Sequence, residues 1–194
     1  MLSEINRRGN RCQTRLECLL TAALLTGRCR NAEEWFIMER VVTLSMFTSL
    51  MLVGLVAGIL LATQLGQVRV QKRLGARDFT LVKHSFELAL GRLMPVLVIG
   101  AGASIVPLLI LLGPVGSVSF IAALIALLLW VGVILVTLIF NAPVNAVARH
   151  WHPDTPPEDW KELRGRWHLG QAIRTPLAVA AFAGVILASV FHLE

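Results

Sequence analysis

Four long apolar stretches alternate with shorter polar segments along the chain. They cover approximately residues 41–65, 90–112, 118–147 and 173–191. Because a helix rises about 1.5 Å per residue, roughly twenty apolar residues cross the hydrocarbon layer of a bilayer, which is ~30 Å thick. The pattern therefore predicts an all-α fold, in which four membrane-spanning helices pack as a four-helix transmembrane bundle.

A stripe of aromatic, basic and amide residues precedes the last apolar stretch. Residues 155–158 read Thr-Pro-Pro-Glu, which is typical of an N-cap, first-turn prolines and the glutamate of a capping box. We therefore predict that an amphipathic helix begins near Pro156, on the cytoplasmic side of the last span. At helical spacing, one face of this helix carries Trp160, Arg164, Trp167, Gln171 and Arg174.

The segment before the second span is also expected to be helical. Its apolar residues recur at three- and four-residue intervals between Asp78 and Leu93, so we predict that it continues into the second span, with Pro95 near the junction. His84 and Glu87 lie three residues apart in this segment and therefore share one helix face.

Basic residues predict the orientation of the spans. Five of them lie between the first two spans (Arg69, Lys72, Arg73, Arg77 and Lys83), and Arg149, Lys161, Arg164 and Arg166 lie between the last two. The turn between spans two and three carries no charge. Because lysine and arginine accumulate on the cytoplasmic side, we expect a multi-pass protein of the inner (plasma) membrane, with two longer cytoplasmic loops and both termini outside.

Residues 1–37 do not fit this pattern. They contain six arginines and all three cysteines, and their apolar stretch, residues 16–25, is too short to span a membrane. We predict that residues 1–37 are an N-terminal extension absent from the native protein and that Met38 starts a single four-helix membrane domain, residues 38–194. The alternative is that the extension forms a cytoplasmic amphipathic helix.

Composition narrows the classes of function. The chain is 56% hydrophobic and 15% charged, whereas soluble domains have about 25% charged residues. Its net charge of +6 is explained by the loops of a membrane protein, and no nucleic-acid-binding motif is present, so we predict no nucleic-acid partner. The cysteines lack the CxxC spacing of metal sites, and no metal site is predicted from them.

Polar residues gather at the predicted cytoplasmic end of the spans. Asn141 and Asn145 are four residues apart, share a helix face, and would be unpaired if they faced lipid. We therefore expect both to point into the bundle and to form part of a polar chamber. Its predicted walls are Gln64, His84, Glu87, Asn141, Asn145, Arg164 and Arg174, with Trp160 and Trp167 as cover.

Several short segments carry a resemblance to a known family. They read NAPVNAVARHW at 141–151, RGRW at 164–167, IRTPLA at 173–178 and FTLVKHSFELALGRLMP at 79–95. With these segments the chain, from about Val41 to Phe191, resembles the anthrone-oxygenase-like family of four-span membrane proteins, most of whose bacterial members carry a domain of unknown function. The resemblance implies an oxidoreductase that oxidises a hydrophobic phenolic or anthrone-like substrate with dioxygen.

This resemblance gives the polar residues hypothetical roles. A base with a pKa near neutrality could deprotonate an anthrone, and His84 has that property. The predicted catalytic residues are His84 as base, with Asn141, Asn145, Arg164 and Arg174 stabilising the anion. The predicted substrate-binding residues are Gln64, Glu87, Trp160 and Trp167.

Other interpretations stay open at this stage. The protein could be a non-catalytic membrane binding or accessory module, which needs a polar cavity and no base. No cofactor is predicted, and haem or metal ligation through His84 is the alternative. The expected partners are the lipid bilayer and a small hydrophobic substrate. The GxxxG spacing of Gly54 and Gly58 is interpreted as close helix packing inside one four-helix bundle, and a homo-oligomer is the alternative.

Overall fold

A computed structural model describes the backbone of residues 29–193, so most of the predicted N-terminal extension, residues 1–28, lies outside the described residues. The chain divides into two compact units, one up to Leu44 and one from Ser45 onwards. Helix α3, Cys29–Ala62, contributes to both, and residues 29–37 belong to the same helix as the first span. The description below concerns the second unit.

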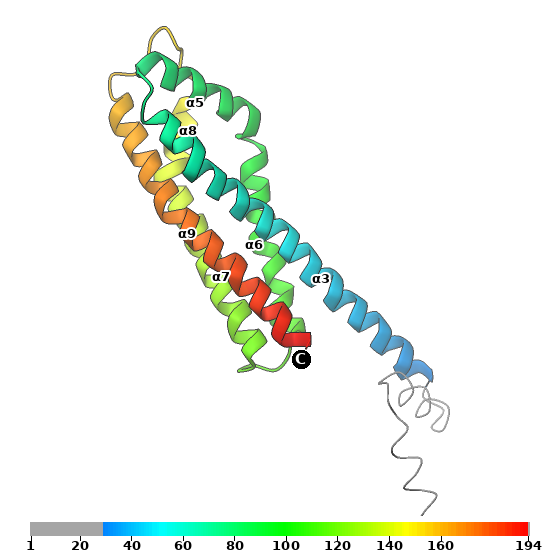
Figure 1. Ribbon diagram of the computed structural model, residues 1–194. Coiled ribbons are helices and arrows are strands. Elements are labelled where there is room, and N and C mark those ends of the chain that lie inside the picture. The colour runs from blue at the N-terminus through cyan, green and yellow to red at the C-terminus, as the bar shows by residue number, and fades with distance from the viewer. Residues whose placement is uncertain (1–28, 194) are drawn as a thin grey trace, which may run out of the picture. The chain divides into compact units, whose positions relative to one another are not determined.

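Two helical stretches of this unit contain a turn of π-helix (Figure 1). The first consists of α3, η1 (Thr63–Gln67) and α4 (Val68–Gln71). The second consists of α7 (Val118–Val136), η2 (Thr137–Asn141) and α8 (Ala142–Ala148). The remaining helices are α5 (Ala76–Leu90), α6 (Leu93–Leu111) and α9 (Trp160–Leu193).

Four helices are long and apolar enough to cross a membrane. They are Trp35–Gln71, Leu93–Leu111, Val118–Ala148 and Trp160–His192. The prediction of an all-α four-helix transmembrane bundle is therefore confirmed, and the chain is a multi-pass membrane protein. Which end faces the cytoplasm stays a prediction.

Two predicted helix boundaries are wrong. The segment from Asp78 does not continue into the second span, because α5 ends at Leu90 and a turn at Gly91 and Arg92 separates it from α6. The helix expected to begin near Pro156 begins at Trp160, because the chain first forms a turn in which the Pro157 carbonyl accepts from the Trp160 N–H at 3.2 Å. The amphipathic segment and the last span are one helix, α9.

The π-turns are held by side chains from α9. A π-turn disturbs the regular helical ladder, so a nearby carbonyl needs another donor. The Leu60 carbonyl, just before η1, accepts hydrogen bonds from Gln171 Nε2 at 3.0 Å and Thr175 Oγ1 at 3.4 Å. The Ile139 carbonyl of η2 lies four residues before Pro143, which has no N–H, and it accepts from Arg166 Nη2 at 2.8 Å.

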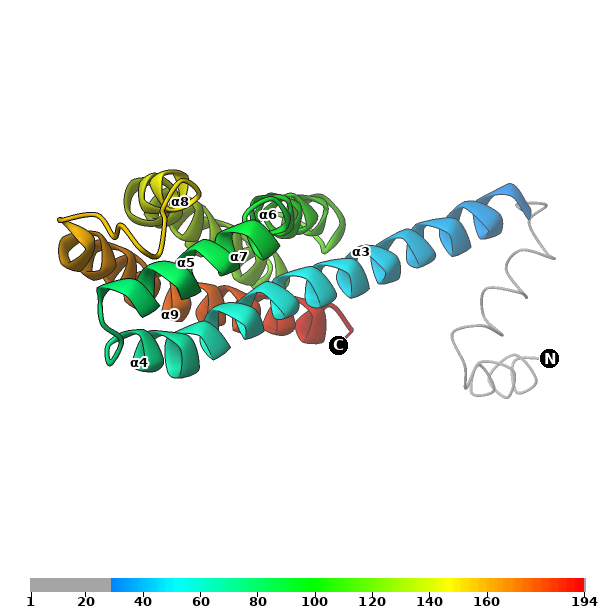
Figure 2. The same cartoon turned by 90° about the horizontal axis from the view of Figure 1, so that it is seen from above.

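Helix α5 packs against α8 and α9 at one end of the bundle (Figures 1 and 2). Beneath it lies a hydrophobic cluster that includes Phe79, Val144, Ala148, Trp151 and Trp167. This packing brings one face of α5 over the ends of the membrane helices, and it therefore positions the polar residues described next.

Candidate functional site

A cavity of about 390 Å³ lies between α5, α6, η2–α8 and α9, with η1 and the end of α3 on one side. Most of its lining is apolar, and a few polar groups converge on it, which is typical of small-molecule sites. Its polar and charged lining residues are Thr63, Gln67, Lys83, Glu87, Thr137, Asn145, Arg149, Trp167 and Arg174.

A buried ion pair forms one wall of this cavity. Lys83 Nζ donates to Glu87 Oε1 at 3.0 Å and to Asn145 Oδ1 at 2.7 Å, and the two charged side chains are only 2% and 7% exposed. Lys83 Nζ also lies 4.4 Å from the centre of the Trp167 ring. Both charged residues lie on α5, one helical turn apart, because they are separated by four positions.

Burial changes the acid–base behaviour of this lysine. The pKa of Lys83 is lowered from 10.5 to about 8, mainly because burial removes water from the ammonium; attraction and the hydrogen bond to the Glu87 carboxylate oppose this shift, and repulsion from Arg174 adds to it. The neutral amine is therefore accessible near physiological pH, which an exposed lysine does not allow.

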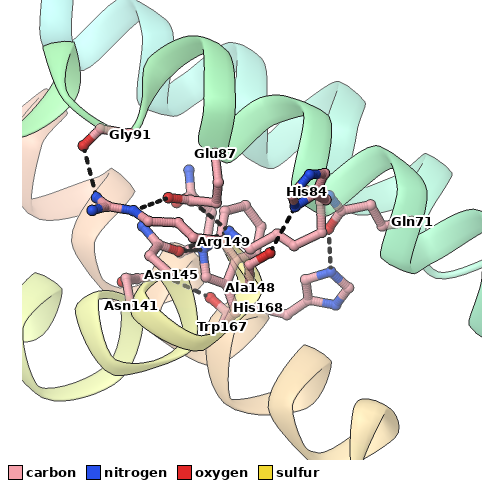
Figure 3. A network of polar contacts seen from close by, with 12 residues as sticks. Gln71, His84, Glu87, Gly91, Asn141, Asn145, Ala148, Arg149, Trp167 and His168 are labelled. Atoms are coloured by element: carbon pink, nitrogen blue, oxygen red, sulfur yellow. Dashed lines mark hydrogen bonds and ion pairs between the residues drawn. The ribbon is translucent and has the colours of Figure 1, made fainter. Parts of the chain in front are cut away.

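Glu87 reaches a second cation through its other oxygen. Arg149 Nε lies 3.9 Å from Glu87 Oε2, and Arg149 Nη2 donates to the Gly91 carbonyl at 3.2 Å (Figure 3). Glu87 Oε2 is buried and has no hydrogen-bond partner among the described residues. Within the described chain, the carboxylate is therefore hydrogen-bonded through Oε1 alone.

The two asparagines both contact Trp167, as expected for residues that point into the bundle (Figure 3). Asn145 Oδ1 accepts from Trp167 Nε1 at 3.0 Å, and Asn141 Nδ2 donates to the Trp167 carbonyl at 3.1 Å. Asn145 lines the cavity, whereas Asn141 is fully buried against α9. Gly170 permits this approach, because a Cβ there would lie 2.5 Å from Asn141 Oδ1.

Arg174 connects the cavity to both π-turns. Its Nε donates to Gln171 Oε1 at 2.8 Å, and its Nη1 donates to Thr137 Oγ1 at 3.3 Å in η2. Gln171 in turn donates to the Leu60 carbonyl beside η1. The guanidinium is thus held in place from two sides, which preorganises a positive charge at the cavity wall.

Four of the nine residues predicted from the sequence line the cavity: Glu87, Asn145, Trp167 and Arg174. His84 shares a helix face with Glu87, but its Nδ1 lies 3.2 Å from the Ala148 carbonyl and it does not line the cavity (Figure 3). Asn141 and Gln64 also lie outside the lining.

Trp160 packs against the hydrophobic cluster under α5, and Arg164 lies 5.8 Å from the centre of the Phe79 ring in that cluster; neither residue lines the cavity. Arg164 Nη1 donates to the Gln71 carbonyl at 3.1 Å and to the Leu74 carbonyl at 3.2 Å, where α4 ends. Its guanidinium lies 4.6 Å from the centre of the Trp160 ring. These contacts connect α4 to α9 and support the position of α5.

Lys83 and Arg149 were missed as site residues, because basic residues in loops were interpreted as topology signals. The four-residue spacing of Lys83 and Glu87 was the signal that could have identified the pair. For metals, no group of three or more histidine, cysteine, aspartate or glutamate side chains that could hold an ion occurs in the described part of the chain.

Comparison with known proteins agrees with the resemblance noted from the sequence. The profile of the family described as anthrone oxygenase matches residues 82–184, which is more than half of the 194-residue chain. The match contains Lys83, Glu87, Asn145, Trp167 and Arg174. No curated protein and no solved structure matches the chain. Because the family profile covers most of the cavity as well as half of the sequence, the chain belongs to the anthrone oxygenase family.

Proposed function

We propose that the protein is a membrane oxidoreductase that binds a flat, hydrophobic phenolic ketone of the anthrone type in the cavity and oxidises it with dioxygen. In this reaction the ring methylene becomes a carbonyl, one dioxygen molecule is consumed and one water molecule is released. The observation that carries the proposal is the buried Lys83–Glu87 pair in the wall of a largely apolar cavity.

The first step requires a base. An anthrone gives up a methylene proton readily because the resulting anion is delocalised over an aromatic system. A general base works best when its pKa lies near the working pH. Lys83, with a pKa lowered to about 8 by burial, meets this condition in its neutral form.

The anion formed in this step needs stabilisation. Arg174 supplies a fixed positive charge at the cavity wall, and Asn145 supplies an amide. Fixed donors in a water-poor cavity stabilise developing charge more effectively than water does. Glu87 lines the cavity, and a small side-chain shift that exposes Oε2 would let its carboxylate accept a hydrogen bond from a phenolic hydroxyl and orient the substrate.

This proposal assigns the role of base to Lys83 in place of His84. The His84 ring points at a main-chain carbonyl, and Lys83 is the group that lines the cavity. Asn141, Arg164 and Trp160 then act indirectly, by holding η2, α4 and α9 in position, and Gln64 has no role in this proposal.

The test is turnover by the full chain in lipid nanodiscs, with anthrone as substrate. Oxygen consumption and anthraquinone absorbance are measured together, because the proposed reaction requires one dioxygen per product. Lys83→Met should abolish turnover, whereas the exposed lysine variant Lys161→Met should retain it. Equal rates for the two variants would overturn the proposed role of Lys83. Binding of anthraquinone without any turnover by the wild-type chain would instead favour the non-catalytic binding module.

A further inference from the structure

One side of the cavity reaches the surface of the membrane-spanning region. Two of its apolar lining residues, Ile99 on α6 and Leu138 on η2, are 63% and 59% exposed. Both lie within helices that are long and apolar enough to span the membrane. In a bilayer their outer surfaces therefore contact lipid chains while their inner surfaces border the cavity.

Tight packing closes α6 against α7 further along the bundle. Trp130 Nε1 donates to the Val98 carbonyl at 2.9 Å, and a Cβ at Gly102 would lie only 2.8 Å from Trp130 Cδ1. The Gly102–Trp130 contact brings the two helices together, and Trp130 Nε1 reaches back toward α5 to meet the Val98 carbonyl. Val98 and Ile99 precede Gly102 on α6 and line the cavity with Leu138, so the opening lies on the α5 side of the Gly102–Trp130 contact.

A charged side chain crosses the α5 end of the same opening. Arg149 extends from the residue after α8 to the Gly91 carbonyl at the α5–α6 turn, and its Nε lies 3.9 Å from Glu87 Oε2 (Figure 3). Its side chain is 48% exposed. The opening is therefore bounded by Trp130 at one end and by Arg149 at the other, and the apolar side chains of Ile99 and Leu138 line its two sides.

We propose that substrate and product pass between the cavity and the lipid phase through a lateral window bordered by Ile99 on α6 and Leu138 on η2. This inference rests on the proposed function, because it treats the cavity as the ligand site. The ligand class is a polycyclic aromatic ketone with few polar groups. Such a compound partitions into the bilayer, because burying apolar surface is favourable, and lateral passage spares it a return to water.

The test measures the rates at which a ligand enters and leaves the cavity. It uses anthraquinone, the product of the proposed reaction, so that no oxidation takes place during the measurement. The full chain is reconstituted in phosphatidylcholine vesicles, and anthraquinone is mixed in from ligand-loaded vesicles. Energy transfer from protein tryptophans to anthraquinone reports binding, because Trp167 lines the cavity and Trp130 lies at its end.

Two pairs of variants separate the window from general effects on a lipid-facing surface. Ile99→Phe narrows the window, and its control is Ile110→Phe, an exposed isoleucine on the same helix outside the lining. Leu138→Ala widens it, and its control is Leu135→Ala, an exposed leucine one turn away that does not line the cavity. Thermal unfolding of each variant checks that the fold is intact.

We expect Ile99→Phe to slow association and dissociation together by roughly fivefold, which corresponds to about 1 kcal/mol on the barrier, with little change in Kd. Leu138→Ala should accelerate both rates, and the two controls should match the wild type. Wild-type rates in all four variants would overturn the window and leave the proposed function standing. Absence of anthraquinone binding by the wild-type chain would instead refute the proposed function.

Discussion

The Lys83–Glu87 pair allows a sharp prediction about stability. Lys83→Met removes a buried ammonium that is 3.0 Å from Glu87 Oε1, and it leaves a carboxylate that is 7% exposed. Removing one partner of a buried ion pair costs about 3–5 kcal/mol, because the other charge is left uncompensated. Arg149 lies 3.9 Å from the same carboxylate but is half exposed, so we expect a loss at the lower end, about 3 kcal/mol.

A double variant tests the cause of this loss. Lys83→Met/Glu87→Leu replaces both charges by apolar side chains, which is often neutral or stabilising when the volumes are similar. Asn145 Oδ1 keeps its hydrogen bond from Trp167 Nε1, so no new unpaired acceptor is created. The double variant should therefore recover most of the stability lost in Lys83→Met while remaining inactive.

The measurement is thermal unfolding of detergent-solubilised protein, followed by tryptophan fluorescence. A loss of about 3 kcal/mol should lower Tm by on the order of 10 °C for a chain of this size. Lys161→Met, which changes an exposed lysine, should leave Tm unchanged. The reasoning is refuted if Lys83→Met has the same Tm as the wild type. It is also refuted if the double variant has a lower Tm than both Lys83→Met and Glu87→Leu.

Four further predictions follow from the same contacts. The protonated Lys83 amine cannot accept a proton, so kcat/KM should rise about tenfold per pH unit below pH 8 and level off above it, whereas a pH-independent kcat/KM between pH 6 and 9 would contradict the role of Lys83 as base. His84→Ala should retain turnover and shift Tm only slightly, measured by oxygen uptake and thermal unfolding. Gly170→Ala should destabilise the fold, since its Cβ would meet η2, and a Tm equal to that of Gly165→Ala would contradict this. Gln171→Leu leaves the carbonyl beside η1 without its main donor, and it should cost about 1–3 kcal/mol in denaturant unfolding, with Gln67→Leu as a comparison.

The membrane helices were predictable from the sequence because hydrophobic length alone determines them. The third span, expected at 118–147, is Val118–Ala148, and the second, expected at 90–112, is Leu93–Leu111. The inward orientation of Asn141 and Asn145 was also predictable, because an amide facing lipid is costly. These features depend on the local amino-acid composition and on the lipid bilayer that surrounds the helices, and the sequence indicates both.

The centre of the candidate site was not predictable in the same way. Lys83 is buried because α5 turns back over the bundle at Gly91, and neither the turn nor its direction follows from helical period. The π-turns were also unforeseen; Pro143, which leaves the Ile139 carbonyl without a helical N–H donor, is the sequence signal that could have pointed to the second one. His84 was preferred over Lys83 because its ordinary pKa is near neutrality, whereas the pKa of Lys83 becomes suitable only through burial.

The hydrogen bonds from α9 to the two π-turns fix the alignment of three helices at once. Arg166, Gln171 and Thr175 meet carbonyls on η2 and beside η1, and they do so only at one rotation and one height of α9. Inserting a single residue between Arg166 and Gln171 would turn these donors by about 100° relative to one another. The polar segment of α9 is therefore expected to accept substitutions far more readily than changes in length.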